Sequence, residues 1–310
     1  MNTAEIDGLR QQVDSLEWYH TIDLGHGIVT PGHYDHRPYL DFYGLSKDLS
    51  GKTVLDIGTA SGFFAFEMER RGAKVTATDL PEWMAHDFGP NYRSEKTPEE
   101  AHSYMHDPFA LAKHVLESKV EKREINIYDI SPQTIGTFDL VFCSSVLLHL
   151  TDPIKALWRI QSVTKESAVI ATAIWQEAGD IEPLAAFAGH RGTAWWIPNH
   201  AALEAMVQTA GFASWEWVSE FRLDFRDGRP GLHHGVIRAW NTEGHPPSTS
   251  EQSPGNTNQT QDSPTRLKLE LVKRDAEIAH LKEMVAGYEQ GRFIRLMRHI
   301  NKWRRKILGG

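Results

Sequence analysis

The chain has 310 residues, of which 40% are hydrophobic and 24% charged, and its formal net charge is −8. This length supports one sizeable α/β domain with appendages. No apolar run approaches the roughly 20 residues that a membrane-spanning helix needs, and the polar N-terminus resembles neither a signal peptide nor a transit peptide. A single cysteine, Cys143, excludes an internal disulfide. We therefore expect a cytoplasmic protein with this thiol in its core.

The charge is unevenly distributed along the chain. From residue 266 to the end, 12 Lys and Arg stand against 5 Asp and Glu, a net charge of +7. Residues 243–265 carry −3, which leaves −12 on residues 1–242. A body this acidic repels polyanions, which argues against nucleic acid as its partner.

Residues 1–50 are predicted to form an N-terminal cap on the domain that follows. Residues 3–17 have the spacing of a short amphipathic helix, and another helix is expected around 39–45. Residues 18–32 mix aromatic side chains, histidines and glycines. That mixture is typical of a segment that folds over a cofactor site, although a plain N-terminal loop fits as well.

Residues 53–79 organise the rest of the chain. The apolar run 54–57 predicts a buried strand, a glycine-rich turn follows it, and residues 63–71 have helical spacing. A second strand, 75–78, ends at Asp79, whose carboxylate can accept both hydroxyls of a ribose. Strand, turn, helix, strand and acid in this order form the nucleotide-binding half of a doubly wound α/β sheet.

The glycine spacing in the turn indicates which nucleotide. The dinucleotide fingerprint G-x-G-x-x-G fails, because Ala60 and Phe63 stand where it needs glycine. The pattern acid-x-G-x-G-x-G is met by Asp56, Gly58 and Gly62, with Ala60 at the remaining position, and it indicates S-adenosylmethionine. Glycines let the backbone approach this ligand closely, and the helix N-terminus offers N–H groups to its carboxylate. An α/β protein whose glycine-rich turn binds no cofactor is the alternative.

Alternating helices and strands continue beyond Asp79. Residues 80–83 form a loop placed to touch an adenine, and Asp129, at the predicted end of a strand, is placed to receive the adenine amino group. We therefore expect residues 51–242 to form a doubly wound, seven-stranded, mostly parallel sheet of Rossmann-like topology. The predicted elements are helices 101–122, 154–163 and 201–210, and strands 124–130, 138–146, 169–174, 215–225 and 235–240.

The remaining 68 residues differ from the body in composition. Residues 243–265 have almost no apolar side chain and are predicted to be a disordered linker. Within 266–290, apolar residues at heptad spacing over 267–288 favour a short parallel homodimeric coiled coil, with a single helix lying on the body as the alternative. Residues 291–310 predict a basic amphipathic helix, with seven Lys and Arg in 291–308. An anionic membrane surface suits such a helix, and nucleic acid or a partner helix would suit it too.

With these residues placed, the chain resembles class I S-adenosylmethionine-dependent methyltransferases. Residues from about 18 to 225 resemble, more narrowly, the branch that contains the tRNA wobble-uridine 5-oxyacetic acid methyltransferases. The resemblance implies a methyl-transferring enzyme with S-adenosylmethionine as its cofactor. The segments that carry it are Trp18-Tyr19-His20, residues 54–58, residues 138–142, residues 146–149 and Trp196-Ile197-Pro198-Asn199 with the following Ala210-Gly211-Phe212.

The departures from that branch bear on the cofactor. The tRNA enzymes hold a carboxylated cofactor with a basic residue of a Trp-Arg-Lys segment and with the Tyr and Arg that flank the histidine of a Tyr-His-Arg segment. Here those segments read Trp18-Tyr19-His20 and Leu148-His149-Leu150. A buried extra carboxylate would lose the cationic and hydrogen-bonding partners that it requires. We therefore expect ordinary S-adenosylmethionine.

Two histidines are candidates for the base that methyl transfer to a hydroxyl requires. His149 follows the fourth strand, beside the expected methyl position, and His20 lies in the N-terminal cap; a structural role is the alternative for each. No metal is expected, because His102 and His106 share a helix face without a third ligand. The residues expected to bind substrate are Trp18, Tyr19, Trp195 and Trp196. The residues expected to bind the cofactor are Asp56, Gly58, Thr59, Ala60, Gly62, Asp79, Leu80, Asp129, Ile130 and Ser144.

Three functions fit these observations. The first is a cytoplasmic methyltransferase, peripheral at the inner face of the membrane, that O-methylates a small molecule or a glycan, which a lipid carrier could hold. The second is a tRNA wobble-uridine (carboxy)methyltransferase, which requires a continuous basic groove on the body. The third is a membrane-associated scaffold with an inactive methyltransferase fold, against which the intact Asp56, Gly58, Gly62 and Asp79 argue.

Overall fold

The computed structural model describes residues 2–89, 92–189 and 194–242. The predicted linker 243–265, coiled coil 266–290 and basic helix 291–310 lie outside the described residues. Among the helices of the described part, none has the length and apolar character that crossing a bilayer requires.

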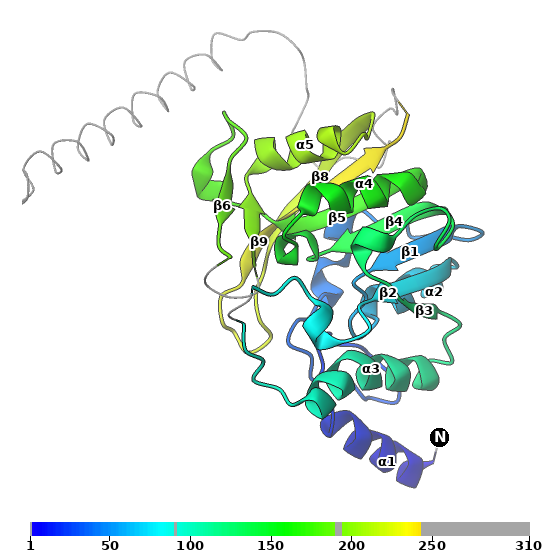
Figure 1. Cartoon of the computed structure of the whole chain (residues 1–310). Helices are drawn as coiled ribbons and strands as arrows, with labels where there is room; N and C mark the ends of the chain where they lie inside the picture. Colours follow the sequence, from blue (N-terminus) through cyan, green and yellow to red (C-terminus); the bar gives the residue numbers. More distant parts are fainter. Residues whose placement is uncertain (1, 90–91, 190–193, 243–310) are drawn as a thin grey trace, which may run out of the picture. The chain divides into compact units, whose positions relative to one another are not determined.

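A seven-stranded sheet forms the centre of the described part, in the order β3-β2-β1-β4-β5-β9-β8 (Figure 1). The strands from β3 to β5 are parallel, and β9 is antiparallel to both of its neighbours, β5 and β8. The predicted seven-stranded, mostly parallel sheet is confirmed. A separate hairpin pairs β6 with β7. The strands are β1 (Thr53–Ile57), β2 (Lys74–Asp79), β3 (Glu121–Glu124), β4 (Phe138–Ser144), β5 (Thr164–Ala173), β6 (Ala185–Phe187), β7 (Trp196–Pro198), β8 (Ser214–Leu223) and β9 (Leu232–Trp240).

Helices cover both faces of this sheet. Figure 1 shows α4 and α5 along one side, with α1 and α3 along the other. Two buried apolar clusters match these layers: one joins α4 and α5 to the sheet, and the other joins α1, α2 and the N-terminal cap to it. The α-helices are α1 (Thr3–Asp14), α2 (Phe63–Arg70), α3 (Pro98–Val115), α4 (Pro153–Val163) and α5 (His200–Thr209). The 3₁₀ helices are η1 (Arg37–Tyr43), η2 (Trp83–Ala85), η3 (Ile127–Asp129), η4 (Leu147–His149) and η5 (Gln176–Ala178).

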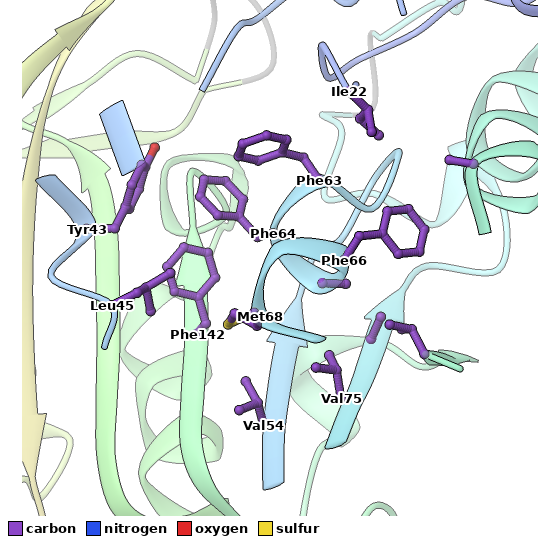
Figure 2. Close-up of a cluster of buried hydrophobic side chains, with 14 of the residues drawn as sticks. Ile22, Tyr43, Leu45, Val54, Phe63, Phe64, Phe66, Met68, Val75 and Phe142 are labelled. Atoms are coloured by element: carbon purple, nitrogen blue, oxygen red, sulfur yellow. The ribbon is translucent and has the colours of Figure 1, made fainter. Parts of the chain in front are cut away.

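Aromatic rings fix α2 and the turn before it against the sheet. In Figure 2, Phe64 of α2 lies between Tyr43 and Phe142, with ring centroids 4.7 Å and 4.6 Å away. Tyr43 and Phe142 are fully buried. Such ring pairs stabilise a fold by about 0.5–1.5 kcal/mol each beyond the apolar area that they bury. The start of α2 and the glycine-rich turn before it are therefore held rigidly against the sheet.

The N-terminal cap is tied together by its own backbone. The Thr21 N–H donates to the Tyr34 carbonyl at 2.8 Å, and the Tyr34 N–H donates to the Tyr19 carbonyl at 3.0 Å. The Tyr19 N–H also donates to the Ser61 Oγ at 3.1 Å, which connects the cap to the glycine-rich turn. Gly32 lies against the first of these segments, since a Cβ on it would come within 2.0 Å of the His20 carbonyl carbon.

Two predicted elements are placed differently by the structure. The helix expected over 101–122 ends at Val115, two residues before Glu117, which adopts a left-handed φ of 52°. The third strand is then Glu121–Glu124 instead of 124–130. This strand lies at the edge of the sheet and is mostly exposed, so it carries charges where a central strand carries apolar residues. The isoleucines of 125–130, which suggested a strand, belong instead to a loop and to η3.

Candidate active site

A cavity of about 350 Å³ lies where β1, β2 and β4 end. Its volume is within the range of about 300–1,000 Å³ typical of small-molecule sites. The strand order reverses between β1 and β4, and crevices at such switch points are where open α/β sheets bind ligands. The strands and the residues directly after them contribute Asp56, Ile57, Gly58, Thr78, Asp79, Leu80, Phe142, Ser144 and Ser145 to the lining.

The turn after β1 approaches the cavity with its backbone. Gly58 has a φ of 74°, and a Cβ on it would lie 2.5 Å from the Val146 Cγ2. Ala60 also adopts a left-handed φ, 45°, which costs a non-glycine residue energy. Gly62, with a φ of 93°, begins α2. The turn is therefore a tight backbone cradle with no room for larger side chains at Gly58.

Asp79 closes this cradle from the end of β2. One carboxylate oxygen accepts the Ala60 N–H at 2.9 Å, and the other accepts the Leu80 N–H at 2.9 Å. Each oxygen has further lone pairs, and the residue lines the cavity. Its carboxylate is therefore fixed in position before a ligand binds, which suits recognition of adjacent hydroxyl groups.

Three polar atoms of cavity-lining residues are buried without a hydrogen-bond partner in the protein. They are the Asp56 Oδ2, the Ser144 Oγ and the His20 Nδ1. Leaving a buried polar group unpaired costs about 1–3 kcal/mol. Burial raises the pKa of Asp56 to about 7, and the charge of Asp79 acts in the same direction. A ligand that offers hydrogen-bond partners to these atoms would recover part of this cost.

The raised pKa of Asp56 predicts how stability depends on pH. Between its ordinary value of 3.8 and about 7, the carboxyl is protonated in the folded chain and ionised in the unfolded chain. The unfolded chain then binds fewer protons, so the free energy of unfolding falls as pH rises through this window. We expect Asp56→Asn to be more stable than the wild type at pH 8 by roughly 2–4 kcal/mol.

Urea unfolding of the two proteins at pH 4, 6 and 8, without added cofactor, measures this effect. The difference between them should shrink toward pH 4, where the carboxyl is protonated in the folded wild type and becomes partly protonated in the unfolded chain as well. Parallel pH profiles for the variant and the wild type would contradict the assignment of this titration to Asp56.

Four histidines outside the sheet line the cavity: His20, His36, His86 and His149. His20 and His36 are 4% and 2% exposed, and their ring centroids are 5.2 Å apart. Burial lowers the pKa of His36 to about 3 and that of His20 well below its ordinary range, so both rings are neutral at pH 7. The Tyr43 hydroxyl lies 2.9 Å from the His36 Nδ1. His149, in η4, and His86, in the loop after β2, are both half-buried, and the His86 Nδ1 lies 2.7 Å from the Trp83 carbonyl oxygen.

The loop after β2 is held over the cavity by Asp87. Its carboxylate accepts the Tyr128 hydroxyl at 2.6 Å and the Thr151 hydroxyl at 2.7 Å. These bonds lower the pKa of Asp87 even though burial opposes the shift. The Asp87 carbonyl accepts the Trp195 Nε1–H at 2.5 Å. The loop is thereby joined to η3, η4 and the β6–β7 hairpin.

Several predicted site residues do lie together at this cavity. Those that line it are Tyr19, His20, Asp56, Gly58, Ala60, Asp79, Leu80, Ser144 and His149. They come from the N-terminal cap, the first turn and the ends of three strands, which is the arrangement the motif predicts.

Other predicted site residues are not part of its lining. Asp129 is exposed and Ile130 is fully buried in the core, because the third strand ends earlier than expected. Asn126, with Ile125 and Ile127, occupies that edge of the cavity.

The predicted substrate-binding tryptophans also lie elsewhere. Trp18 is 1% exposed and donates its indole N–H to the Val13 carbonyl at 2.9 Å, so it is a core residue of the cap. Trp195 and Trp196 lie outside the lining, and the Trp196 indole donates to the Thr151 carbonyl at 3.2 Å. Thr59 and Gly62 belong to the glycine-rich turn but do not line the cavity.

Sequence reasoning missed two features of the site. His36 lines the cavity next to His20. The only signal for this in the sequence is its position two residues after the aromatic Tyr34. Ser145 lines the cavity too, and its hydroxyl lies 3.0 Å from the Nε2 of His234, a residue of β9. No local signal connects Ser145 with a histidine 89 residues further along the chain.

The charge of the lining is one-sided. Among the described residues that form the cavity wall, three have acidic side chains, Asp56, Asp79 and Asp87, and none is Lys or Arg. Opposite charges attract strongly in a partly desolvated crevice, and like charges repel. The cavity therefore favours a cationic ligand and disfavours one with an additional carboxylate or phosphate.

Comparison with known proteins agrees with this geometry. The model of the methyltransferase domain family matches residues 33–216, more than half of the chain. The ubiquinone biosynthesis O-methyltransferase of Dechloromonas aromatica (strain RCB) is 33% identical over 117 residues, which are 37% of this chain and 40% of that protein. The tRNA U34 carboxymethyltransferase of Pseudomonas aeruginosa (strain LESB58) is 27% identical over 170 residues, 54% of this chain and 46% of that protein.

A similar solved structure is the N-terminal domain of EvdMO1, crystallised in the presence of SAH and D-fucose. It has a TM-score of 0.53 and 18% sequence identity, and the match covers 77% of this chain and 97% of that domain. The chain spans less than half the length of the curated relatives that it matches here. The family match and the sheet order confirm the resemblance that the motifs suggest. This chain is a member of the methyltransferase domain family, with the fold of a class I S-adenosylmethionine-dependent methyltransferase.

Proposed function

We propose that this protein transfers a methyl group from S-adenosylmethionine to a hydroxyl of an uncharged small molecule or glycan. The observation that carries the proposal is the one-sided composition of the cavity, whose described wall holds three acidic side chains and no Lys or Arg. The cofactor has a sulfonium and an ammonium group but a single carboxylate, so it suits such a wall. A carboxylated cofactor or a phosphorylated acceptor does not suit it.

The residues present fit this cofactor. Asp79, fixed by two backbone N–H groups, would accept the ribose hydroxyls, and the backbone at Gly58 leaves room for close approach. The unpaired Asp56 Oδ2 offers a partner to a cationic group. Apolar Ile125 and Ile127 flank Asn126 at the edge of the cavity where the adenine would lie. When bound, S-adenosylmethionine supplies an electrophilic methyl group on its sulfonium.

The chain's own contribution to the chemistry is alignment, exclusion of water and removal of one proton. His20 and His36 are buried and held neutral, so they suit hydrogen bonding more than proton storage. Of the two half-buried histidines in the cavity wall, His86 has its Nδ1 2.7 Å from the Trp83 carbonyl oxygen, and His149 lies at the end of η4, five residues after β4. We assign His149 the role of general base for the acceptor hydroxyl.

This assignment makes a kinetic prediction. We expect His149→Ala to lower kcat by about 10²–10⁴-fold, the usual contribution of a positioned base, while the Kd for S-adenosylmethionine changes less than about threefold. Transfer of a radiolabelled methyl group and calorimetric titration measure the two quantities. An unchanged kcat would remove His149 from the mechanism, and a large rise in Kd would make it a cofactor-binding residue.

The proposal as a whole is tested by titrating the full chain with S-adenosylmethionine and with its carboxylated counterpart. We expect micromolar binding of the first and at least tenfold weaker binding of the second. Leu150→Arg adds a cation to the cavity wall and should reduce the ratio between the two Kd values. The matched Leu150→Met should leave this ratio unchanged. Preference for the carboxylated cofactor would favour the tRNA wobble-uridine function. No binding of either at millimolar concentration would favour an inactive scaffold.

The charged tail extends the proposal to location. Residues 291–308 carry seven Lys and Arg without an acid, which supports attachment to an anionic membrane surface from the cytoplasmic side. The heptad pattern of 267–288 supports a homodimer. Flotation of the full chain and of a chain ending at residue 290 with anionic liposomes tests the attachment, and equal flotation contradicts it.

A further inference from the structure

Ser145 has an unusual place in the cavity wall. It follows β4 with a φ of 55°, in the left-handed region that a non-glycine residue seldom occupies. Its backbone N–H donates to the Ala171 carbonyl of β5 at 2.8 Å, which holds it there. Strained backbone of this kind clusters at functional sites, which indicates a function for the Ser145 side chain.

The partner of that side chain is His234, which the sheet register places opposite. Ala173 of β5 pairs with His234 of β9, next to the end of β4. The His234 Nε2 lies 3.0 Å from the Ser145 Oγ, and its Nδ1 lies 3.0 Å from the Leu232 carbonyl oxygen. The imidazole is 4% exposed and stacks on Phe221 with ring centroids 5.8 Å apart.

The direction of these two hydrogen bonds follows from elementary chemistry. A carbonyl oxygen only accepts, so the His234 Nδ1 carries the ring hydrogen and the Nε2 of the neutral ring is an acceptor. Burial, as the main cause, lowers the pKa of His234 to about 4, which keeps the ring neutral at pH 7. The Ser145 hydroxyl therefore donates its hydrogen to His234.

We propose that Ser145, oriented by His234, presents only hydrogen-bond-accepting lone pairs to the cavity. It thereby selects the substrate that receives the methyl group through one of that substrate's O–H donors. If the hydroxyl hydrogen of Ser145 were free, the side chain could pair equally well with a hydrogen-bond donor or a hydrogen-bond acceptor of the substrate. With its hydrogen committed to His234, Ser145 accommodates only a donor and leaves an ether or carbonyl oxygen unpaired. The inference rests on the proposed function, because it names the group of the substrate that this cavity recognises.

The hydrogen-bond direction is tested without any ligand. Nitrogen-15 NMR of the histidine side chains distinguishes a protonated from an unprotonated ring nitrogen, and the signals that disappear in His234→Gln identify this residue among 16 histidines. We expect a protonated Nδ1 and an unprotonated Nε2 at pH 7. The reverse tautomer, or a doubly protonated ring, would overturn the proposal.

The recognition step is tested with two small probes on the full chain saturated with S-adenosylhomocysteine. Ethylene glycol has O–H donors, and 1,2-dimethoxyethane keeps its O–C–C–O chain but carries a methyl group in place of each hydroxyl hydrogen. We expect a saturable amide shift at Ser145 with ethylene glycol and at least about tenfold weaker binding of the diether. Equal binding of both, or binding of neither near Ser145, would overturn the proposal.

Matched variants separate orientation from mere structure. His234→Gln can still accept from Ser145 and should keep the glycol preference, whereas His234→Phe keeps the ring stacked on Phe221 and should lose it. Ser145→Ala should lose it as well. If His234→Phe retains the preference while remaining folded by its amide spectrum, the orienting role is wrong. Failure of the wild type to bind S-adenosylhomocysteine would instead contradict the proposed function.

Discussion

Replacing Asp79 with alanine should raise the Kd for S-adenosylmethionine by about 100-fold or more. The carboxylate would accept both ribose hydroxyls, and a hydrogen bond to a charged group contributes about 1.5–3 kcal/mol. The variant loses both acceptors, together with the two backbone N–H bonds that hold the turn in its ligand-free position. At roughly 1.4 kcal/mol per tenfold change, the loss of even two interactions accounts for this effect. Calorimetric titration with the cofactor and with S-adenosylhomocysteine measures it.

Two variants control this experiment. Asp79→Asn keeps one acceptor oxygen and should fall between the wild type and Asp79→Ala. Asp227 also accepts a backbone N–H, from Arg229 at 3.0 Å, but it lies in an exposed turn outside the cavity lining. Asp227→Ala should bind the cofactor as the wild type does. Wild-type affinity in Asp79→Ala would mean that the cofactor does not bind across the end of β2.

Gly32→Ala should displace the N-terminal cap from the cavity. The added Cβ would lie 2.0 Å from the His20 carbonyl carbon and 2.2 Å from the Thr21 backbone nitrogen, and backbone atoms cannot yield as a flexible side chain does. We expect a loss of stability of at least about 1–3 kcal/mol, typical of overpacking, and loss of methyl transfer, because His20 and Tyr19 move with this segment of the cap. Urea unfolding and a turnover assay measure the two effects.

Amide hydrogen exchange locates the damage of this substitution. Protection should fall at Thr21 and Tyr34, whose N–H groups pair the two parts of the cap, while the central strands stay protected. Gly8→Ala is the matched control, because nothing lies within 4 Å of its Cβ in α1. It should leave turnover unchanged and stabilise the helix by about 0.5–1 kcal/mol. Unchanged exchange in Gly32→Ala would show that the cap tolerates the extra atom.

The first half of the nucleotide-binding unit was predictable because its signals are local. Glycines marked both ends of α2, and short apolar runs marked β1 and β2, so the structure confirms these elements within one or two residues. Asp56, Gly58 and Asp79 followed from the same motif. In this segment the backbone conformation and the strand ends depend on residues that are neighbours in the chain. A single sequence is therefore enough to predict them.

The rest of the site depends on contacts that no local pattern reveals. Asp129 was misplaced because an exposed edge strand, Glu121–Glu124, is rich in charge and the apolar residues after it are not in the sheet. Trp18 suggested a stacking surface, but its indole N–H finds a partner within the cap. The Ser145–His234 pair arises from the register of β9 on β5, which pairs residues far apart in the chain.

The position of Cys143 gives this fold an internal reporter. It is the one cysteine of the sequence, lies fully buried in β4 between β1 and β5, and burial raises the pKa of its thiol. A disulfide reagent can reach it only when the middle of the sheet separates. The rate of its labelling in native buffer therefore measures how often the central strands part, and any compound that slows the labelling can be recognised as a ligand before its chemistry is known.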